Sequence, residues 1–350
     1  MLVSEKKKDH IARIGVIGTS GRGSSMFPLL TEMDDVIVPA VCDLYEDRAK
    51  EAAKKAGEDQ GITVDAYTDY KEMFQRGDLD AVLITASWAA HGYLAVDAMN
   101  AGIYPAVECG GGSSIDECWQ LVRTSQRTGV PCMALENCCY DKEEMAILRM
   151  IKEGIFGELI HCTGGYGHDL REEVSFGREN RHYRFDNYMH RNADLYPGHA
   201  IGPLSKFLNI NRGNRMLTLT SMASKARGLN EYLLREKGEE YDVSRAQFCE
   251  GDIVTTMIKC AHGETILLTH DTTLPRYYSR FCGVSGTKGT WNHDGGLIFI
   301  DGRSPIDGWD HPPEKFEDYY KEFEHPLWKE FSKEGVKGGH GGMDWLVLRA

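Results

Sequence analysis

The sequence predicts an α/β protein: a Rossmann domain with a doubly wound parallel sheet, followed by an α+β domain with a mostly antiparallel sheet. Two observations support this fold class. Up to about residue 135, short apolar strands alternate with helices, which is typical of a parallel sheet covered on both faces. From residue 159 to 300, strand patterns follow one another without regular helical crossovers. We therefore expect two domains, at residues 1–140 and 141–350.

The first domain begins with a strand, a glycine-rich turn and a helix. Residues 13–18 form the apolar strand, residues 19–23 (TSGRG) form the turn, and a helix is expected to begin near Ser24. A second apolar strand, residues 36–41, leads to Asp43, twenty residues beyond the turn. Glycines let the backbone approach a pyrophosphate, and the N–H groups of the helix N-terminus bind its charge. This order predicts NAD binding, and favours NAD over NADP because the acid would repel a 2′-phosphate.

The remaining elements follow from apolar periodicity and from turn residues. In the first domain and at its boundary we expect a strand at 80–85, a helix at 93–100, a strand at 104–108, a helix at 114–128, a strand at 129–135 and a helix at 142–153. In the second domain we expect strands at 217–221, 253–259, 265–269 and 280–285, and an amphipathic helix at 314–324.

Composition excludes several classes of function. The net charge of −13 argues against nucleic acid or an anionic membrane as a partner. No run reaches the roughly 18 apolar residues that a spanning helix needs, and residues 1–10 contain no apolar signal-peptide core. These observations predict a cytoplasmic enzyme. The ten cysteines contain no C-x-x-C pair and the histidines no H-E-x-x-H motif, so we expect reduced thiols and no metal.

Several motifs resemble the Gfo/Idh/MocA family of NAD(P)-dependent oxidoreductases. Residues 80–85 (DAVLIT), the following His91, and residues 108–110 (ECG) resemble its D-A-V-x-I-x-T strand, histidine and E-K-P element. Residues 191–203 (RNADLYPGHAIGP) resemble a stretch of its NAD-dependent glycosidases, glycoside hydrolase family 109. The other motifs shared with that family lie at 136–140, 208–213, 270–280, 324–328 and 340–344.

The resemblance implies a redox route for cleaving a terminal α-linked N-acetylgalactosamine. Bound NAD⁺ takes hydride from C3 of the sugar, which acidifies the C2 proton. A base removes that proton and the anomeric group leaves; water then adds at C1, and the hydride returns to C3. NAD is regenerated at each turnover, so it is expected to be tightly bound.

The catalytic candidates are His199, Tyr166 and Tyr196. His199 is assigned to the O3 proton, because imidazole titrates near neutral pH. Tyr196 lies three residues before His199, on the same face if the segment is helical, and could share that proton. The resemblance makes Tyr166 the C2 base, for which a phenol needs a nearby cation. His199 as a helix cap and Tyr166 as the cover of a strand end are the alternatives.

The resemblance also implies two sets of binding residues. Those expected to contact the sugar are Glu136, Arg184, Tyr278 and His340. Those expected to bind the cofactor are Gly18, Ser20, Gly21, Arg22, Gly23, Asp43, Trp88, His91, Glu108 and Asn137.

Three departures from the family pattern leave other functions open. Ser20 replaces a loop glycine, Gly198 replaces a threonine, and residues 109–112 (CGGG) are unusual after Glu108, with Cys109 in place of the lysine that many family dehydrogenases use. A thiol has no fixed positive charge, which counts against the first alternative, an NAD-dependent sugar dehydrogenase. The second alternative is a non-catalytic NAD or sugar sensor.

Two expectations concern the surface and the chain end. A small-molecule glycoside is the expected partner, and an exposed face of the second sheet would suit a homo-oligomer. Residues 341–350 stop soon after an apolar helix begins, so we expect the chain to be truncated relative to its full protein. The exact sugar and anomer stay open, since pocket shape decides them.

Overall fold

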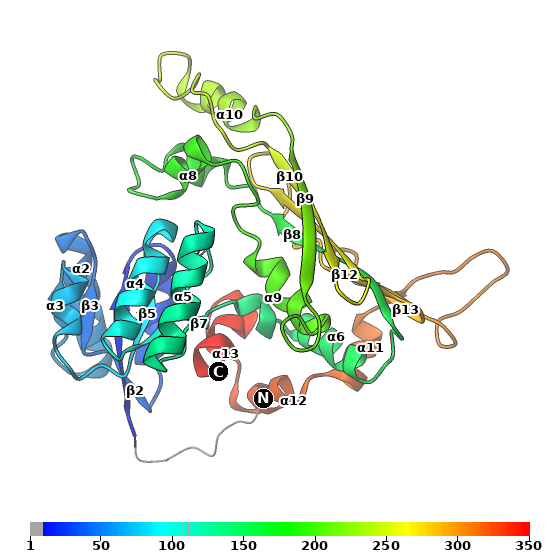
Figure 1. Ribbon diagram of the computed structural model, residues 1–350, viewed down its shortest axis with the longest axis horizontal. Helices are drawn as coiled ribbons and strands as arrows, with labels where there is room; N and C mark the ends of the chain where they lie inside the picture. Colours follow the sequence, from blue (N-terminus) through cyan, green and yellow to red (C-terminus); the bar gives the residue numbers. More distant parts are fainter. Residues whose placement is uncertain (1–9, 111) are drawn as a thin grey trace. The chain divides into compact units, whose positions relative to one another are not determined.

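A computed structural model describes residues 10–110 and 112–350 (Figure 1). Contacts divide the chain into a first unit, residues up to 135 with residues 337–350, and a second unit, residues 136–336. The last fourteen residues, which the sequence analysis assigned to the second domain, thus pack with the first unit. Residues 1–10 were expected to contain no signal-peptide core. All of them except residue 10 lie outside the described residues.

The first unit contains a seven-stranded sheet in which every recorded pairing is parallel. Its order is β4 (Asp65–Tyr67), β3 (Ala40–Cys42), β1 (Ala12–Ile17), β5 (Ala81–Ile84), β6 (Tyr104–Val107) and β7 (Met133–Ala134), and β2 (Val36–Ile37) pairs with β1. The chain leaves β1 toward β3 and returns on its other side at β5. In open α/β sheets ligands bind at such a switch point. The predicted parallel Rossmann sheet is confirmed.

Prolines change two of the expected strands. The strand expected at 36–41 is divided into β2 and β3, with Pro39 between them. Proline has no N–H for the ladder, and the neighbouring Val38 N–H donates to Gln60 Oε1 at 2.8 Å instead. The strand expected at 129–135, which contains Pro131, shortens to the two residues of β7.

Helices of the first unit cover this sheet. They are α1 (Arg22–Thr31), α2 (Glu46–Gln60), α3 (Tyr70–Phe74), α4 (Trp88–Asn100) and α5 (Ile115–Thr128), followed at the chain end by η2 (His340–Gly342) and α13 (Met343–Arg349). The core between sheet and helices includes Val82, Ile84 and Leu94, each at most 2% exposed. Helix α4 begins five residues before the expected start at Tyr93. The expected start of α5 is confirmed, because Ser114 Oγ accepts from the Glu117 N–H.

The second unit contains an eight-stranded sheet. Its order is β15 (Glu314–Lys315), β14 (Leu297–Ile300), β13 (Gly289–Asn292), β12 (Gly283–Gly286), β8 (Leu159–Gly167), β11 (Thr265–Asp271), β10 (Ile253–Cys260) and β9 (Met216–Ala223). Only β8 and β11 pair in parallel among these neighbours. The expected mostly antiparallel sheet is therefore confirmed.

One face of this sheet is covered by helices. The helices of the second unit are η1 (Asn137–Tyr140), α6 (Lys142–Lys152), α7 (Arg171–Ser175), α8 (Arg184–His190), α9 (Gly198–Phe207), α10 (Gly228–Lys237), α11 (Glu317–Phe323) and α12 (Pro326–Glu334). Helices α6 and α9 lie on this face (Figure 1), and Ile147 of α6, Leu204 of α9 and Ile266 of β11 are fully buried in one core cluster. Helices α7, α8 and α10, which lie among the second unit's strands, were not predicted from the sequence, whereas a helix was considered at Tyr196 and His199, near the start of α9. No helix in the described part of the chain is long and apolar enough to cross a membrane.

Candidate functional site

The glycine-rich turn of the first unit forms an anion site at the start of α1. Gly21 is the N-cap residue, at φ +54°, and a Cβ there would meet nothing within 4 Å. No side chain in the described part of the chain caps this helix, and its first turn has no acidic residue. An uncapped helix N-terminus with an open glycine fits a pyrophosphate, whose oxygens would accept from the first N–H groups.

Asp43 fixes the other side of this turn. It follows β3, is 7% exposed, and its Oδ2 accepts from Thr19 N at 2.9 Å and Thr19 Oγ1 at 3.1 Å. Its Oδ1 accepts from Tyr45 N at 3.0 Å. The acid therefore lies at the end of the second strand beside the glycine turn, where a Rossmann domain holds the ribose hydroxyls.

Trp88 and His91 lie on the first turn of α4, and both are buried. His91 Nε2 donates to the Ala86 carbonyl at 2.9 Å, so Nδ1 is the acceptor of the neutral ring. Burial lowers the pKa of His91, which keeps it neutral. Nδ1 is buried and has no hydrogen-bond partner among residues 10–110 and 112–350. Such an acceptor fits a hydroxyl or amide donor of a bound cofactor.

The segment after β6 explains one departure from the family pattern. Gly110 has φ +94°, and a Cβ there would lie 2.2 Å from Trp88 Nε1. Proline, the family residue, is fixed near φ −65° and cannot adopt this conformation. The Glu108-Cys109-Gly110 segment thus follows a backbone path that the E-K-P element could not follow.

Two predicted binding residues belong to a different unit from the other residues of their predicted group. Asn137, expected at the cofactor, belongs to η1 of the second unit. His340, expected at the sugar, belongs to the first unit and contacts Asp344 and Arg22 there. The other nine cofactor residues all lie in the first unit.

The second unit brings His199 and Glu136 together. His199 is in the first turn of α9, and its Nδ1 lies 2.8 Å from Glu136 Oε1. The same oxygen accepts from Cys138 N at 3.1 Å, which holds the carboxylate at the start of η1. Because Nδ1 donates to the carboxylate, Nε2 is the acceptor of the neutral imidazole. The ring can therefore take a proton at Nε2 while Glu136 stabilises the resulting cation.

Tyr166, on β8, is the centre of this cluster. Its ring centroid lies 5.4 Å from that of His199 and 4.7 Å from that of Tyr196. Its hydroxyl is 2.9 Å from His168 Nδ1. Burial raises the pKa of the Tyr166 phenol, and the positive charge of Arg184 opposes that effect. Arg184 is thus the nearby cation that a phenolic base requires.

Arg184 and Tyr278 complete the cluster. Arg184, on α8, is 8% exposed; its Nε lies 2.5 Å from Glu173 Oε1 and its Cζ 5.4 Å from the Tyr196 ring centroid. The Tyr278 ring lies 6.3 Å from that of Tyr166. Except for His340, the residues predicted for catalysis and sugar binding thus form one connected group.

Sequence reasoning missed His168 and Glu173. His168 could have been found, because residues two apart on a strand share a face and it follows Tyr166 by two. Glu173 gave no such signal, since its contact with Arg184 depends on how α7 and α8 pack. The reason given for Tyr196 was wrong: α9 begins at Gly198, so Tyr196 precedes the helix. Its ring nevertheless lies 4.8 Å from that of His199.

A second layer of titratable groups lies behind Tyr166. His270 is fully buried, 6.4 Å from the Tyr166 ring. Its Nδ1 is 3.4 Å from Asp194 Oδ1, and its Nε2 is 3.7 Å from Glu250 Oε1. Burial lowers the pKa of His270 to about 3 and raises those of Asp194 to about 6 and Glu250 to about 8.

Comparison with known proteins identifies the second unit. Residues 140–350, more than half of the chain, match the family described as "Glycosyl hydrolase 109, C-terminal domain". This protein belongs to glycoside hydrolase family 109. Residues 12–135 match "Oxidoreductase family, NAD-binding Rossmann fold". The resemblance inferred from the motifs is confirmed, and the chain is an enzyme with an NAD-binding domain.

Relatives and solved structures agree with this assignment. The family 109 chain is 40% identical to a glycosyl hydrolase family 109 protein of Stenotrophomonas maltophilia, over 97% of this chain and 79% of that protein. It is 38% identical to an alpha-N-acetylgalactosaminidase of Tannerella forsythia, over 98% and 77%. An NAD binding oxidoreductase from Klebsiella pneumoniae shares the fold, at TM-score 0.67 and 19% identity, over 96% of this chain and 87% of that one.

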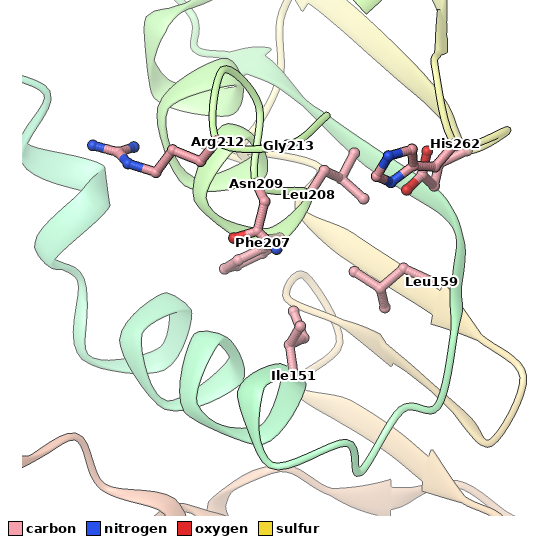
Figure 2. A pocket seen from close by; sticks show the side chains of 9 residues that line it. Ile151, Leu159, Phe207, Leu208, Asn209, Arg212, Gly213 and His262 are labelled. Carbon is pink, nitrogen blue, oxygen red and sulfur yellow. The ribbon is translucent and has the colours of Figure 1, made fainter. Parts of the chain in front are cut away.

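The family 109 protein also has an open cavity of about 240 Å³ in its second unit. Figure 2 shows Ile151, Leu159 and Phe207 around it, and its lining includes none of the predicted site residues. It lies at the C-terminal end of α9, whereas His199 is at the N-terminal end. The cluster of Tyr166 and His199 thus lies outside the lining of this cavity.

Proposed function

We propose that this family 109 enzyme hydrolyses a terminal α-linked N-acetylgalactosamine and keeps NAD bound through the cycle. The observation that carries the proposal is the packing of Tyr166 and His199, two proton-transfer groups that each have a polar partner. Relatives from Tannerella forsythia and Shewanella oneidensis, 38% and 35% identical, are named alpha-N-acetylgalactosaminidase.

His199 acts on a sugar hydroxyl. When bound, NAD supplies a hydride acceptor and donor, so the carbon that is oxidised must lose a hydroxyl proton at the same time. Nε2 of His199 takes that proton and later returns it. The Nδ1–Glu136 contact of 2.8 Å supports this role, because the carboxylate orients the ring and stabilises its protonated form.

Tyr166 acts on the neighbouring carbon. Oxidation at C3 acidifies the C2 proton, and the Tyr166 oxygen removes it. His168 Nδ1, 2.9 Å from that oxygen, can relay the phenol proton. Burial lowers the pKa of His168, so its ring is neutral and can accept a proton. The positive charge of Arg184 supports the phenolate.

Assay of the purified protein with p-nitrophenyl α-N-acetylgalactosaminide tests the proposal, with nitrophenolate and NADH recorded together. We expect nitrophenolate release without net NADH, and its loss in His199→Ala. NADH accumulation on the free sugar without glycoside cleavage would support the dehydrogenase alternative. No turnover of any sugar by the folded, NAD-loaded protein would support a sensor.

A second copy of the chain is the proposed partner of the second sheet. Met222 of β9 and Met257 of β10 lie on the face opposite the core and are 76% and 43% exposed. Burying such side chains against a copy would remove apolar area from water. Light scattering should show a dimer that Met222→Lys with Met257→Lys converts to a monomer; a monomeric parent protein would contradict this.

A further inference from the structure

Arg22 of the glycine-rich turn is held by two carboxylates from distant parts of the first unit. Its Nε donates to Glu108 Oε1 at 2.8 Å, just after β6. Its Nη1 donates to Asp344 Oδ2 at 2.8 Å and its Nη2 to Asp344 Oδ1 at 2.6 Å. The Asp344 contact is thus bidentate, the geometry in which guanidinium–carboxylate pairs are strongest.

The two carboxylates more than neutralise the positive charge that Arg22 could offer to a diphosphate. The Asp344 and Glu108 side chains are 1% and 6% exposed, so solvent screens them little. Two carboxylates surround one guanidinium, which leaves the cluster with a net negative charge. A pyrophosphate at α1 would then depend on the N–H groups of the turn, and Arg22 would serve to fix their positions.

The segment that supplies Asp344 is shaped around this contact. A Cβ at Gly339 would lie 2.9 Å from Asp344 Oδ2, so glycine leaves room for the carboxylate. His340 Nδ1 lies 2.8 Å from the same oxygen. Beyond Asp344, Leu346 and Val347 are buried in the first unit.

We propose that Asp344 is a positioning residue of the cofactor site: through Arg22 it locks the NAD-binding turn, and residues 337–350 thereby set how tightly NAD is held. A preordered turn loses less conformational entropy when the diphosphate binds. The proposal deepens the retention of NAD within the proposed function, but it depends only on NAD binding and not on glycoside cleavage.

The test is calorimetric titration of the NAD-free protein and of its Asp344→Asn variant with NAD⁺ and with ADP-ribose. We expect Kd to rise at least tenfold for both ligands, because both contain the diphosphate. Simple Coulomb attraction predicts the opposite, since the variant removes a negative charge near a dianion. An unchanged or lower Kd would overturn the proposal, whereas loss of glycosidase activity alone would bear only on the proposed function.

Two further variants keep the test decisive. Arg349→Ala removes another anchor of the same segment, its 2.5 Å contact with Asp35, without touching the turn, and should leave Kd within about twofold. An equal rise in both variants would overturn the role of Asp344. If Asp344→Asn does not fold, Arg22→Lys replaces it. Lysine keeps the charge but cannot form the bidentate contact with Asp344, so an unchanged Kd would again overturn the proposal.

Discussion

His199 Nδ1 and Glu136 Oε1 lie 2.8 Å apart, although 63 residues separate them in the chain. Glu136 is the residue before η1, and His199 is the second residue of α9. The pair links η1 to α9, and the His199 ring of α9 lies 5.4 Å from the Tyr166 ring. This arrangement fixes the tautomer and orientation of the imidazole, as the proposed proton transfer from one specific hydroxyl requires.

Replacement of Glu136 by glutamine should lower kcat about tenfold to a hundredfold, less than the roughly 10²–10⁴-fold typical of an acid–base group itself, because Glu136 acts through His199. The amide can still hydrogen-bond Nδ1, but it cannot stabilise the protonated ring. Steady-state kinetics with the nitrophenyl glycoside measure the effect. A change confined to KM would show that Glu136 only binds the sugar.

Replacement of Tyr166 by phenylalanine should separate two proton transfers. Cleavage should fall by roughly 10²–10⁴-fold, the range for loss of an acid–base group, while NADH formation from the bound sugar persists. In D₂O, the parent enzyme should place deuterium at C2 of the product, read by NMR. Tyr278→Phe is the matched control and should retain that label; label at C2 in Tyr166→Phe would exclude Tyr166 as the base.

Stability should fall as the pH rises from 6.5 to about 8, because of Glu250. Burial raises the pKa of this carboxyl from 4.5 to about 8, so the folded state holds a proton that the unfolded state has lost. The contribution of Glu250 to the free energy of unfolding is fully present below pH 4.5 and is lost as the pH rises through about 8. His270, whose pKa is lowered from 6.5, acts with the opposite sign only below that pH.

Thermal unfolding across this pH window measures the Glu250 effect. Glu250→Gln keeps an acceptor for the Ala193 N–H and should flatten the fall in Tm. Glu240→Gln, an exposed carboxyl, should leave it as in the parent protein. Equal pH slopes in all three proteins would show that Glu250 does not hold the proton.

Replacement of Gly110 by alanine should destabilise the first unit more than replacement of Gly102. Both glycines have positive φ, +94° and +78°, so both substitutions cost about 1–2 kcal/mol of backbone strain. Only the Gly110 substitution also places a Cβ 2.2 Å from Trp88 Nε1, whereas Gly102 faces open space. Urea unfolding of both variants compares the two costs, and equal losses would contradict the close packing of Gly110 on Trp88.

The Rossmann fold was predictable because its signals are local. Strand, glycine turn, helix and Asp43 follow one another within about thirty residues. The structure has the predicted strand, turn and helix in this order. Pro39 and Pro131 were also visible in the sequence, so the shortened strands could have been predicted from the missing N–H. The short helices α7 and α8 could not, because helices of one or two turns depend on tertiary packing.

Site residues that belong to a sequence motif could be predicted. Contacts that depend on how distant segments pack could not. Tyr166, Tyr196 and His199 were found through the family resemblance, although the reason given for Tyr196 was wrong. The contacts of Arg184 with Glu173 and of Arg22 with Asp344 join residues whose partners no spacing rule specifies. In the second case 322 positions separate the partners, and periodicity carries no information at that distance.

The discontinuity of the first unit has a consequence for synthesis. Residues 10–135 are synthesised first, while about two hundred residues of the second unit remain to be translated. During that interval the nascent Rossmann sheet can form, but Arg22 has Glu108 and not yet Asp344 as a carboxylate partner. Translation of Asp344 is then the step that completes the cofactor turn, so a chain interrupted within the second unit would bind NAD weakly even with its nucleotide-binding strands in place.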